Sequence, residues 1–306
     1  MPDLAIIIVN YNTRDLLGGC LRSIRQSMGE ISYRVVVVDN CSSDGSPDMV
    51  RAEHPWVHQL IVPERNGGYA HANNIGLRAV GYGGRSPESL PRYALLLNPD
   101  TVLPREALQK AWAFMEANPD VGVLGPKLVR EDGNLDKACR RSFPTPEVAF
   151  YRFSGLGRLF PGSRRFGRYN LTYLDADEQT DLDAVAGAFM LIRTAALEQG
   201  GLLDEAFFMY GEDLDLCYRI KQHGWRVVYY PAITVLHVKG AASRKTSRRA
   251  IIAFYDAMRI FHDKHYRART FFLVNWAIDL GVVLLRHSAL LGDCLRSTER
   301  KRVASA

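Results

Sequence analysis

Apolar residues occur along the first part of the chain in short unbroken runs that alternate with helical patterns. The runs at residues 4–9, 34–38 and 93–97 are rich in Val, Ile and Leu, as is typical of strands that are buried on both faces. Between them, apolar residues recur at helical spacing over residues 16–24 and again over residues 69–80. This alternation predicts an α/β fold in which crossover helices join a Rossmann-like, mostly parallel sheet.

The periodic pattern weakens after residue 125. Residues 130–180 are rich in Arg, Pro, Gly and aromatic residues without a clear period, which is typical of binding loops on a rigid scaffold. Regular patterns return at residue 185, with a predicted strand at 188–192 and a short helix that ends at 200–201. A predicted helix at residues 213–223 and two predicted strands at 226–230 and 233–236 follow. We therefore expect one large domain followed by a smaller C-terminal part.

The composition is that of an ordinary globular protein. With 47% hydrophobic and 24% charged residues, it excludes a disordered or fibrous chain. The five cysteines are scattered and lack metal-binding spacing, so we expect reduced thiols in a cytoplasmic protein, with neither a disulfide nor a zinc framework. The first apolar run has no basic flank and is too short for a signal peptide.

Polar residues follow several apolar strands at the point where each strand is predicted to end. Asp39 follows one strand, Asn98 and Asp100 follow another, and His237 follows the last. Open α/β sheets bind ligands at the carboxyl ends of their strands, so these side chains are expected to share one site. Two local explanations stay open: Asp39 can cap the turn at residues 42–45, and Asp100 can be a turn-forming residue.

Asp100 and His237 are the predicted ligands of a divalent cation. Mg²⁺ and Mn²⁺ neutralise the charge of a nucleotide diphosphate, and they accept carboxylate oxygens while keeping positions for phosphate and water. Asp39 is expected to accept hydrogen bonds from the base or ribose of the same nucleotide. The turn containing Asn66 and Gly68 enters a helix, so its backbone N–H groups can face a phosphate or ribose.

Glu212 and Asp213 lie in the first turn of a predicted helix, directly after the apolar residues Phe207 to Tyr210. Crowded carboxylates in an apolar setting raise each other's pKa, which suits a general base. The alternative is that these acidic residues only complement the helix dipole, worth about 0.3–1 kcal/mol per charge. We expect Asp213 to be the base, with Glu212 as its nearest rival.

Other motifs exclude several function classes. The chain has no P-loop, no dinucleotide-binding glycine motif between a strand and a helix, and no serine hydrolase elbow. Arg140 and Arg141, in the irregular region, are candidates for binding an acceptor diphosphate. No recognised nucleic-acid module or aromatic platform accompanies the basic residues, so no nucleic-acid partner is expected.

Six motifs, taken in order, resemble those of the inverting family 2 glycosyltransferases of GT-A fold, and most of all their bacterial rhamnosyltransferase-like branch. The motifs are IIVNYN at residues 7–12, VVDNCSSDG at 37–45, NGGY at 66–69, LNPD at 97–100, GA at 187–188 and FMYGEDLDLC at 208–217. The resemblance covers residues 3–240. The set of motifs is highly specific to the family and much less specific to a sugar.

The resemblance implies roles for the matched residues. Asp39 would contact the nucleotide base, Asp100 would bind the metal within the D-x-D equivalent, His237 would be a further metal ligand, and Asp213 would be the base. The first position of the D-x-D equivalent is Asn98 here, so fewer carboxylates hold the metal. Other residues of the matched motifs are expected at the donor (Asn10, Tyr11, Asn12, Asn66, Gly68 and Asn98) or at the acceptor (Gly187 and Ala188).

As a whole, the resemblance implies a metal-dependent inverting enzyme of cell-surface polysaccharide synthesis. The donor would be a dTDP- or UDP-sugar, and for this branch dTDP-rhamnose is the expected one. The acceptor would be a hydroxyl of a glycan or of a polyprenyl-diphosphate-linked sugar. Residues 1–240 would form the catalytic domain, with a donor-binding half at about 1–125 and an acceptor-binding half at about 126–240. Two alternatives stay open: a nucleotidyltransferase, and a non-catalytic sugar-nucleotide-binding or membrane-associated protein of the same fold.

The positive charge of the chain is concentrated in a basic helical extension at residues 241–306. The formal net charge is +6, and from residue 239 onward 14 Lys and Arg stand against five Asp and Glu. Residues 271–285 are nearly all apolar but fall short of the roughly 20 residues that span a bilayer. We expect a helix that lies on the anionic inner face of the cell membrane, or one that packs on the catalytic domain or on a second copy in a homodimer.

Overall fold

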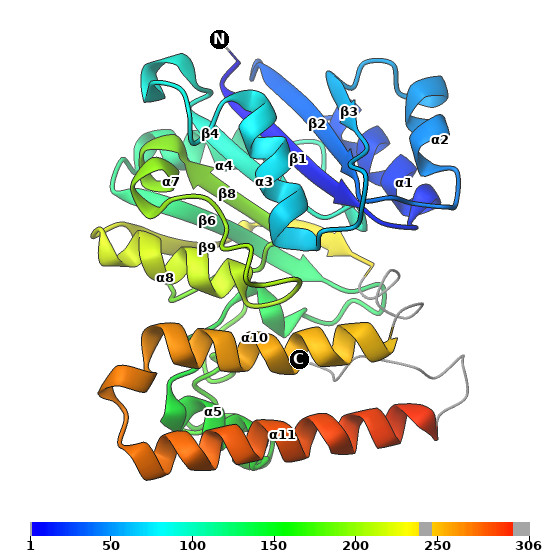
Figure 1. Cartoon of the computed structure of the whole chain (residues 1–306). Helices are drawn as coiled ribbons and strands as arrows, with labels where there is room; N and C mark the ends of the chain where they lie inside the picture. The colour runs from blue at the N-terminus through cyan, green and yellow to red at the C-terminus, as the bar shows by residue number, and fades with distance from the viewer. Residues whose placement is uncertain (1, 239–246, 296–306) are drawn as a thin grey trace.

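The computed structural model describes residues 2–238 and 247–295 (Figure 1). The last basic residues of the predicted extension, 296–306, lie outside the described residues. Within the described part, a mixed sheet is packed against helices, and the two long helices α10 and α11 lie together beyond one side of the sheet (Figure 1).

The described residues form a nine-stranded sheet in the order β3-β2-β1-β4-β8-β6-β9-β5, with β7 paired to β9. Strands β1 to β4 pair in parallel, whereas β8 runs antiparallel to both β4 and β6. The strands are β1 Leu4–Asn10, β2 Tyr33–Asp39, β3 Gln59–Ile61, β4 Tyr93–Leu97, β5 Thr101–Val102, β6 Val121–Val129, β7 Thr180–Asp181, β8 Phe189–Arg193 and β9 Arg226–His237. The predicted α/β class is confirmed.

The helices connect these strands and cover the sheet. They are α1 Arg14–Arg25, α2 Ser46–Glu53, α3 Tyr69–Val80, α4 Ala107–Ala117, α5 Pro146–Phe153, α6 Leu156–Leu159, α7 Thr194–Gly200, α8 Glu212–Gln222, α10 Ser247–His265 and α11 Phe272–Cys294. The predicted helix at residues 69–80 is therefore confirmed in full. The two strands predicted at 226–230 and 233–236 are instead one strand, β9, with an irregularity in its pairing to β6 at the Pro126/Lys127 step.

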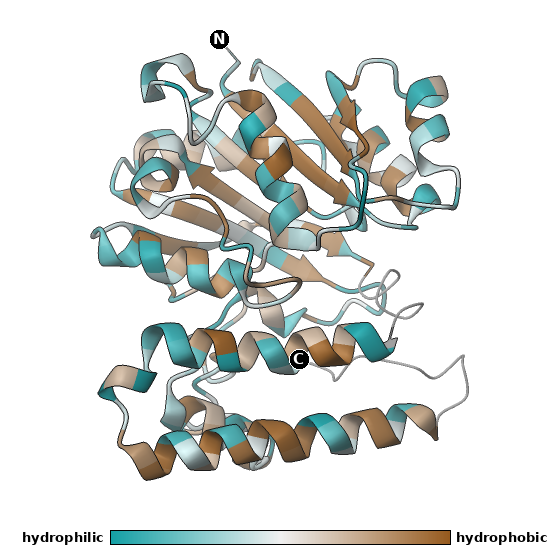
Figure 2. Cartoon of the chain, in the orientation of Figure 1, coloured by the Kyte–Doolittle hydropathy of each residue, from teal (hydrophilic) through white to brown (hydrophobic). Residues whose placement is uncertain are grey.

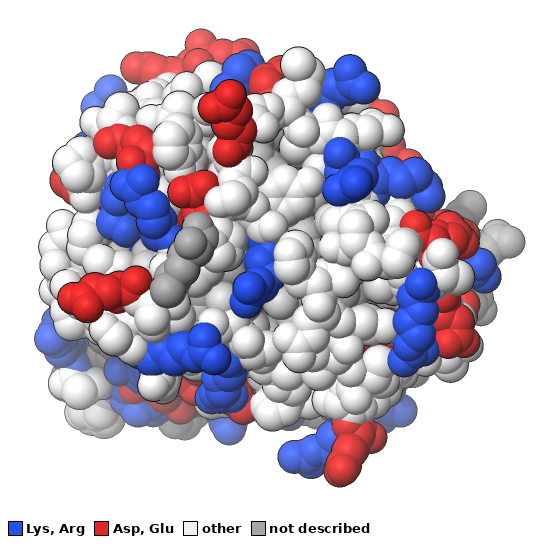
Figure 3. Space-filling model, turned by 90° about the horizontal axis from the view of Figure 1, so that it is seen from above, with Lys and Arg blue, Asp and Glu red and all other residues white. Residues whose placement is uncertain are grey.

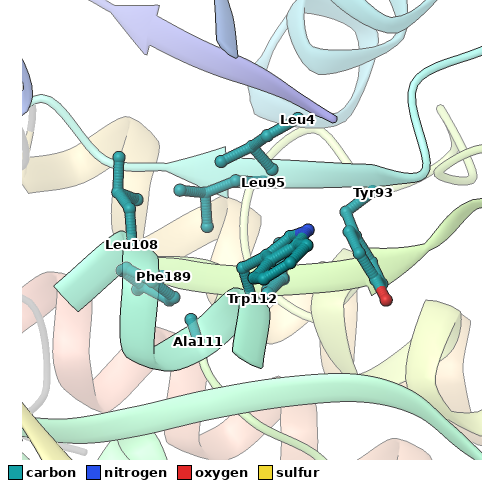
Figure 4. Close-up of a pocket in the computed structure, with 8 residues that line it drawn as sticks. Leu4, Tyr93, Leu95, Leu108, Ala111, Trp112 and Phe189 are labelled. Atoms are coloured by element: carbon teal, nitrogen blue, oxygen red, sulfur yellow. The ribbon is translucent and has the colours of Figure 1, made fainter. Parts of the chain in front are cut away.

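Helix α4 shows how closely the helices pack on the sheet. Leu108, Ala111 and Trp112 of α4 meet Leu95 and Phe189 of the sheet (Figure 4). The void that remains between them is about 10 Å³, which is room for about one water molecule. The interior under α4 therefore offers no ligand site.

Helix α10 follows the predicted boundary at residue 240 but packs into the catalytic core. Its residues Ala257 and Phe261 are buried members of that core. The fully buried Asp215 of α8 forms ion pairs with Lys264 and His265 of α10, each at 2.8 Å. Both apolar burial and buried charge thus hold α10 in place.

Helix α11 has its charged groups turned toward the protein. Asp279 pairs with Arg267 at 2.7 Å, and Arg286 pairs with Asp256 of α10 at 3.2 Å. A small apolar cluster that includes Val282 joins α11 to α10. The polar groups of α11 are therefore used for docking on the rest of the protein.

The opposite face of α11 is apolar and exposed. Phe272, Leu273 and Trp276 are 67%, 55% and 63% exposed, and apolar segments recur along the helix (Figure 2). With 23 residues, α11 is longer than the apolar run at 271–285, and by length and composition it could cross a membrane. Length alone therefore does not decide between a spanning helix and one that lies on a surface.

Asp215 should stabilise the fold into the acidic range. Burial alone would raise its pKa, but the bonds to His265, Arg219 and Lys264 outweigh burial and lower the pKa to about 2. Because the pKa of an unfolded Asp is about 3.9, the contribution of roughly 2–3 kcal/mol is complete above about pH 4 and is lost as the pH falls toward about 2.

Acid unfolding of Asp215→Asn, followed by circular dichroism, tests this expectation. The variant should be less stable than wild type at pH 7, and the difference should shrink below about pH 4. Asp263→Asn is the matched control, because the ion pair of Asp263 with Arg267 is exposed and contributes at most about 1 kcal/mol. A difference between Asp215→Asn and wild type that is independent of pH would contradict the expectation.

Candidate active site

A cavity of about 680 Å³ opens at the carboxyl ends of the parallel strands. On one side it is bounded by the ends of β1, β2 and β4, and on the other by α5, α10 and α11. The predicted site residues that line it are Tyr11, Asn66, Gly68, Asn98, Asp100, Arg141, Gly187, Ala188, Glu212, Asp213 and His237. Asn10, Asn12, Asp39 and Arg140 do not line this cavity.

The pairing of β5 with β9 places His237 beside Asp100. Thr101 lies opposite His237 in antiparallel register, and the N–H of Val238 donates to the Asp100 carbonyl at 2.8 Å. His237 Nε2 is 3.4 Å from Asp100 Oδ1, and His237 Nδ1 is 2.9 Å from Oδ2 of the buried Asp136. Sequence reasoning missed Asp136, which lies in the irregular region and carries no local motif.

This arrangement fits a divalent cation. Asp100 Oδ1 is buried and accepts no hydrogen bond from the described residues, so a cation there would satisfy it. No group of three or more His, Cys, Asp and Glu ligands is present among the described residues, so phosphate and water would complete the coordination, as Mg²⁺ tolerates. Asp136 would orient the ring of His237, as carboxylates do for metal-binding histidines.

His237 carries a proton in this arrangement. Burial opposes the charged ring, but the ion pair with Asp100 and the hydrogen bond to Asp136 outweigh burial and raise the pKa of His237 to about 9. The ring proton and a cation would thus compete for the same place between His237 and Asp100, because a metal binds the neutral ring.

Asp213 is held in a fixed orientation at the start of α8. Its Oδ2 accepts hydrogen bonds from Arg141 Nη2 at 2.6 Å and from the Gly187 N–H at 3.1 Å. Its Oδ1 accepts the N–H of Leu214 at 2.8 Å. The motif at 187–188 and the predicted acceptor residue Arg141 therefore both meet at this carboxylate.

Glu212 has a different environment from its neighbour. Its side chain is buried, and within the described part of the chain Oε2 has no hydrogen-bond partner. Burial first, and then the charge of Asp213, raise the pKa of Glu212. The two adjacent carboxyl groups thus differ, since Glu212 is buried with a raised pKa and Asp213 is paired with Arg141.

The turn before Glu212 is strained. Tyr210 has a φ of 71°, which is unfavourable for a residue with a side chain, and Gly211 follows with a φ of 82°. Of the three other described non-glycine residues with positive φ, two, Asn12 and Cys41, lie near Asp39, and the third is Leu171. Such strain persists where the surrounding structure holds side chains in functional positions.

The expected nucleotide contact of Asp39 is not presented to this cavity. Asp39 is fully buried, and its two oxygens accept hydrogen bonds from Asn10 Nδ2 and from the Ser42 N–H, each at 2.7 Å. It therefore fixes the ends of β1 and β2, as the turn-capping alternative expects, and its contact with the nucleotide stays a prediction. The adjacent Asn40 lines the cavity, and its buried Oδ1 has no hydrogen-bond partner among the described residues.

Gly68 sits where the chain must pass close to another segment. Its φ is 95°, and a Cβ there would lie 2.3 Å from the Phe208 carbonyl oxygen. Phe208 also accepts the N–H of Tyr69 at 2.7 Å, and Asn66 Oδ1 accepts the N–H of Gly68 at 3.0 Å. The Asn66–Gly68 turn, which leads into α3, is thus joined to the segment that leads into α8.

The remaining predicted residues divide into supporting and lining positions. Asn12 Oδ1 accepts the N–H of Ser43 at 2.8 Å, which supports the turn after β2. Asn98 Oδ1 accepts the hydroxyl of Tyr69 at 2.9 Å. Arg140 donates to the backbone carbonyls of residues 174 and 175 and is buried, so of the predicted arginine pair only Arg141 reaches the cavity.

Comparison with known sequences indicates the family to which the chain belongs. A sequence model described as glycosyltransferase like family 2 matches residues 2–251. N-acetylglucosaminyl-diphospho-decaprenol L-rhamnosyltransferase of Mycobacterium tuberculosis is 26% identical over 304 residues, which cover 97% of this chain and 96% of that protein. Rhamnosyltransferase WbbL of Escherichia coli is 26% identical over 235 residues, which cover 76% of this chain and 82% of that protein.

Solved structures share the fold. A mannosyltransferase from Pyrobaculum calidifontis, in complex with GDP-Man and Mn²⁺, matches with a TM-score of 0.54 at 19% identity. The match covers 97% of this chain and 76% of the mannosyltransferase chain. TarS 1–349 of S. aureus in complex with UDP matches with a TM-score of 0.52 at 16% identity. That match covers 88% of this chain and 67% of the TarS chain. The predicted GT-A fold and rhamnosyltransferase-like resemblance are confirmed. Since the family model spans most of the chain, the protein belongs to glycosyltransferase like family 2.

Proposed function

We propose that the protein is an inverting glycosyltransferase in which Asp213 is the general base. The position of Asp213 carries the proposal, because Arg141 and Gly187 fix its carboxylate in the cavity that also contains Asp100 and His237. Its Oδ1 accepts one backbone N–H, and a carboxylate oxygen accepts two hydrogen bonds, so one position remains for an acceptor hydroxyl.

The reaction follows from these positions. The acceptor hydroxyl gives its proton to Asp213 while its oxygen bonds to the anomeric carbon of the donor, and the bond from that carbon to the nucleotide diphosphate breaks. Arg141 holds the carboxylate in the orientation of attack. A Mg²⁺ or Mn²⁺ ion held by Asp100 and His237 would supply positive charge to the departing diphosphate.

The sugar and the acceptor are proposed from the relatives. Two of them are rhamnosyltransferases, and the printed name of one specifies an N-acetylglucosaminyl-diphospho-decaprenol acceptor. For this chain we propose transfer of rhamnose from dTDP-rhamnose to a sugar on a polyprenyl diphosphate, in cell-surface polysaccharide synthesis. The unpartnered Oδ1 of Asn40 supports a thymine or uracil nucleotide, whose ring N–H is a hydrogen-bond donor.

A lipid-linked acceptor needs an enzyme at the membrane surface, and α11 supports this location. Its exposed face is apolar, while its charged residues dock on α10 and on the preceding turn. A helix of this kind gains apolar burial in the interface and about 1 kcal/mol for each basic residue near anionic lipid. We therefore propose peripheral binding to the inner face of the cell membrane.

Asp213→Asn should lower turnover by roughly 10²–10⁴, the usual contribution of a general base. Asn keeps an oxygen for Arg141 but cannot accept the proton. The measurement is the release of nucleotide diphosphate from dTDP-rhamnose and a panel of other nucleotide sugars in the presence of the acceptor.

Glu212→Gln is the matched control for Asp213→Asn. Because burial keeps Glu212 neutral, an amide should replace the acid with a loss of no more than about tenfold in turnover. The assignment of the base would be reversed if Glu212→Gln lost more activity than Asp213→Asn.

Asp100→Ala should weaken binding of the nucleotide diphosphate chiefly when Mg²⁺ or Mn²⁺ is present, because the carboxylate acts through the cation. Calorimetry with and without metal measures the enhancement. An enhancement equal to that of wild type would remove Asp100 from the metal site.

Replacing Phe272 and Trp276 together by Glu should abolish binding to anionic vesicles, because both side chains lie on the exposed face of α11. Wild type should cosediment with vesicles in proportion to their phosphatidylglycerol content and less so at high salt. The control replaces Met28 and Val62 by Glu, because both are apolar and, at 60% and 45%, exposed, but lie outside α11. Two results together would assign this face to a subunit interface instead: wild type does not bind vesicles, and wild type is a dimer whereas the double variant is a monomer.

A further inference from the structure

The cavity at the active site extends past the residues that the proposed chemistry uses. Its apolar extension, here called the side arm, is lined by residues of α5, α10 and α11. Its lining residues are Ala149 and Phe153 of α5, Phe254 and Met258 of α10, and Ile278 and Val282 of α11. All six side chains are apolar, although the cavity that contains them also contains Asp213.

We propose that the side arm binds the first isoprene units of the acceptor's polyprenyl chain. The inference rests on the proposed function, because it assigns a place to one part of the proposed acceptor. A polyprenyl chain is branched hydrocarbon, and about 0.8 kcal/mol is gained for each CH₂ group that moves from water into apolar surroundings. An empty apolar arm joined to the reaction site matches an acceptor whose hydrocarbon follows directly on a diphosphate.

Two arginines stand where the acceptor diphosphate would lie. Arg152 and Arg249 both line the cavity, and neither forms an ion pair within the part of the chain that the structure describes. Arg152 Nη1 is buried and finds no hydrogen-bond partner in residues 2–238 and 247–295, and its guanidinium lies 3.9 Å from the ring centroid of Tyr169. The Arg249 guanidinium lies 4.3 Å from the ring centroid of Phe208. Stacked guanidinium groups with free donors suit a phosphate.

The outer surface around the side arm is also apolar. The exposed side chains of α5 and the following segment include Phe150, Leu159 and Phe160, at 63%, 69% and 48% exposure. Helix α11, on the other wall of the arm, exposes its own apolar face. On the face of the molecule away from α11, acidic and basic side chains are interspersed (Figure 3). A chain leaving the arm would therefore enter a bilayer on the apolar side.

Acceptors with one head group and different chains test the inference. N-acetylglucosaminyl diphosphate is esterified with methyl, citronellyl or farnesyl groups, and the KM of each is measured with dTDP-rhamnose in solution without detergent or vesicles. The farnesyl acceptor should have a KM at least tenfold below that of the methyl acceptor, since burial of two CH₂ groups already gives about tenfold.

Variants locate the effect within the protein. Ala149→Leu and Ile278→Trp fill the side arm, so each should reduce the farnesyl-to-methyl preference to less than about threefold. Ala277→Leu is the matched control, because Ala277 lies on α11 but is exposed and does not line the cavity, and it should keep the wild-type preference. Arg152→Gln should raise the KM of all three acceptors alike, because the diphosphate is common to them.

The outcomes separate this inference from the proposed function. Transfer to all acceptors with equal KM would overturn the proposal that the side arm binds the polyprenyl chain, but would leave the proposed glycosyltransferase function standing. The assay is repeated with vesicles added. A preference for farnesyl that appears only then would show that the membrane, and not the side arm, binds the hydrocarbon, and would also overturn the proposal. Absence of transfer from every nucleotide sugar to every acceptor would instead overturn the proposed function.

Discussion

The structure depends on the requirement that each buried carboxylate has a hydrogen-bond donor or a cationic side chain as its partner. Asp39, Asp136 and Asp215 are all fully buried, and an unpaired carboxylate in such a place costs several kcal/mol. Their partners come from other elements: Asn10 of β1 for Asp39, His237 of β9 for Asp136, and Lys264 and His265 of α10 for Asp215. Each pairing thereby joins two segments that are distant in sequence, and the cavity is bounded by the segments so joined.

The sequence predicted those parts of the site that are marked by local pattern. Asp100 and His237 follow apolar strands, and Asp213 begins a helical pattern after aromatic residues, so a reader of the chain can place all three at one edge of the sheet. The fold class was predictable for the same reason, because buried parallel strands and amphipathic helices leave different periods in the sequence.

Other parts of the site have no local signal. Asp136 lies in the irregular region, and its contact with His237 joins residues 101 positions apart. The pairing of Arg141 with Asp213 spans 72 positions, so neither residue's neighbours indicate it. Asp39 shows the converse, since a motif marks the residue but one of its oxygens accepts from Asn10 at the end of β1 and the other from the turn after β2. Such contacts follow from how the chain returns to the sheet edge and cannot be read from composition or spacing.

Helix α11 combines two properties that are usually opposed, because its charged residues face the protein and its apolar residues face outward. With 23 residues it is about 34 Å long, enough to span a bilayer. However, it lies against α10, which carries charged residues such as Asp256, Asp263 and Lys264 and is itself fixed to the catalytic core through Asp215. A spanning α11 would draw those charges into hydrocarbon, at a cost of about 2.5 kcal/mol or more for each. A helix that lies flat avoids this cost and still buries its apolar face, so the docking of α10 on Asp215 is what favours a surface position for α11.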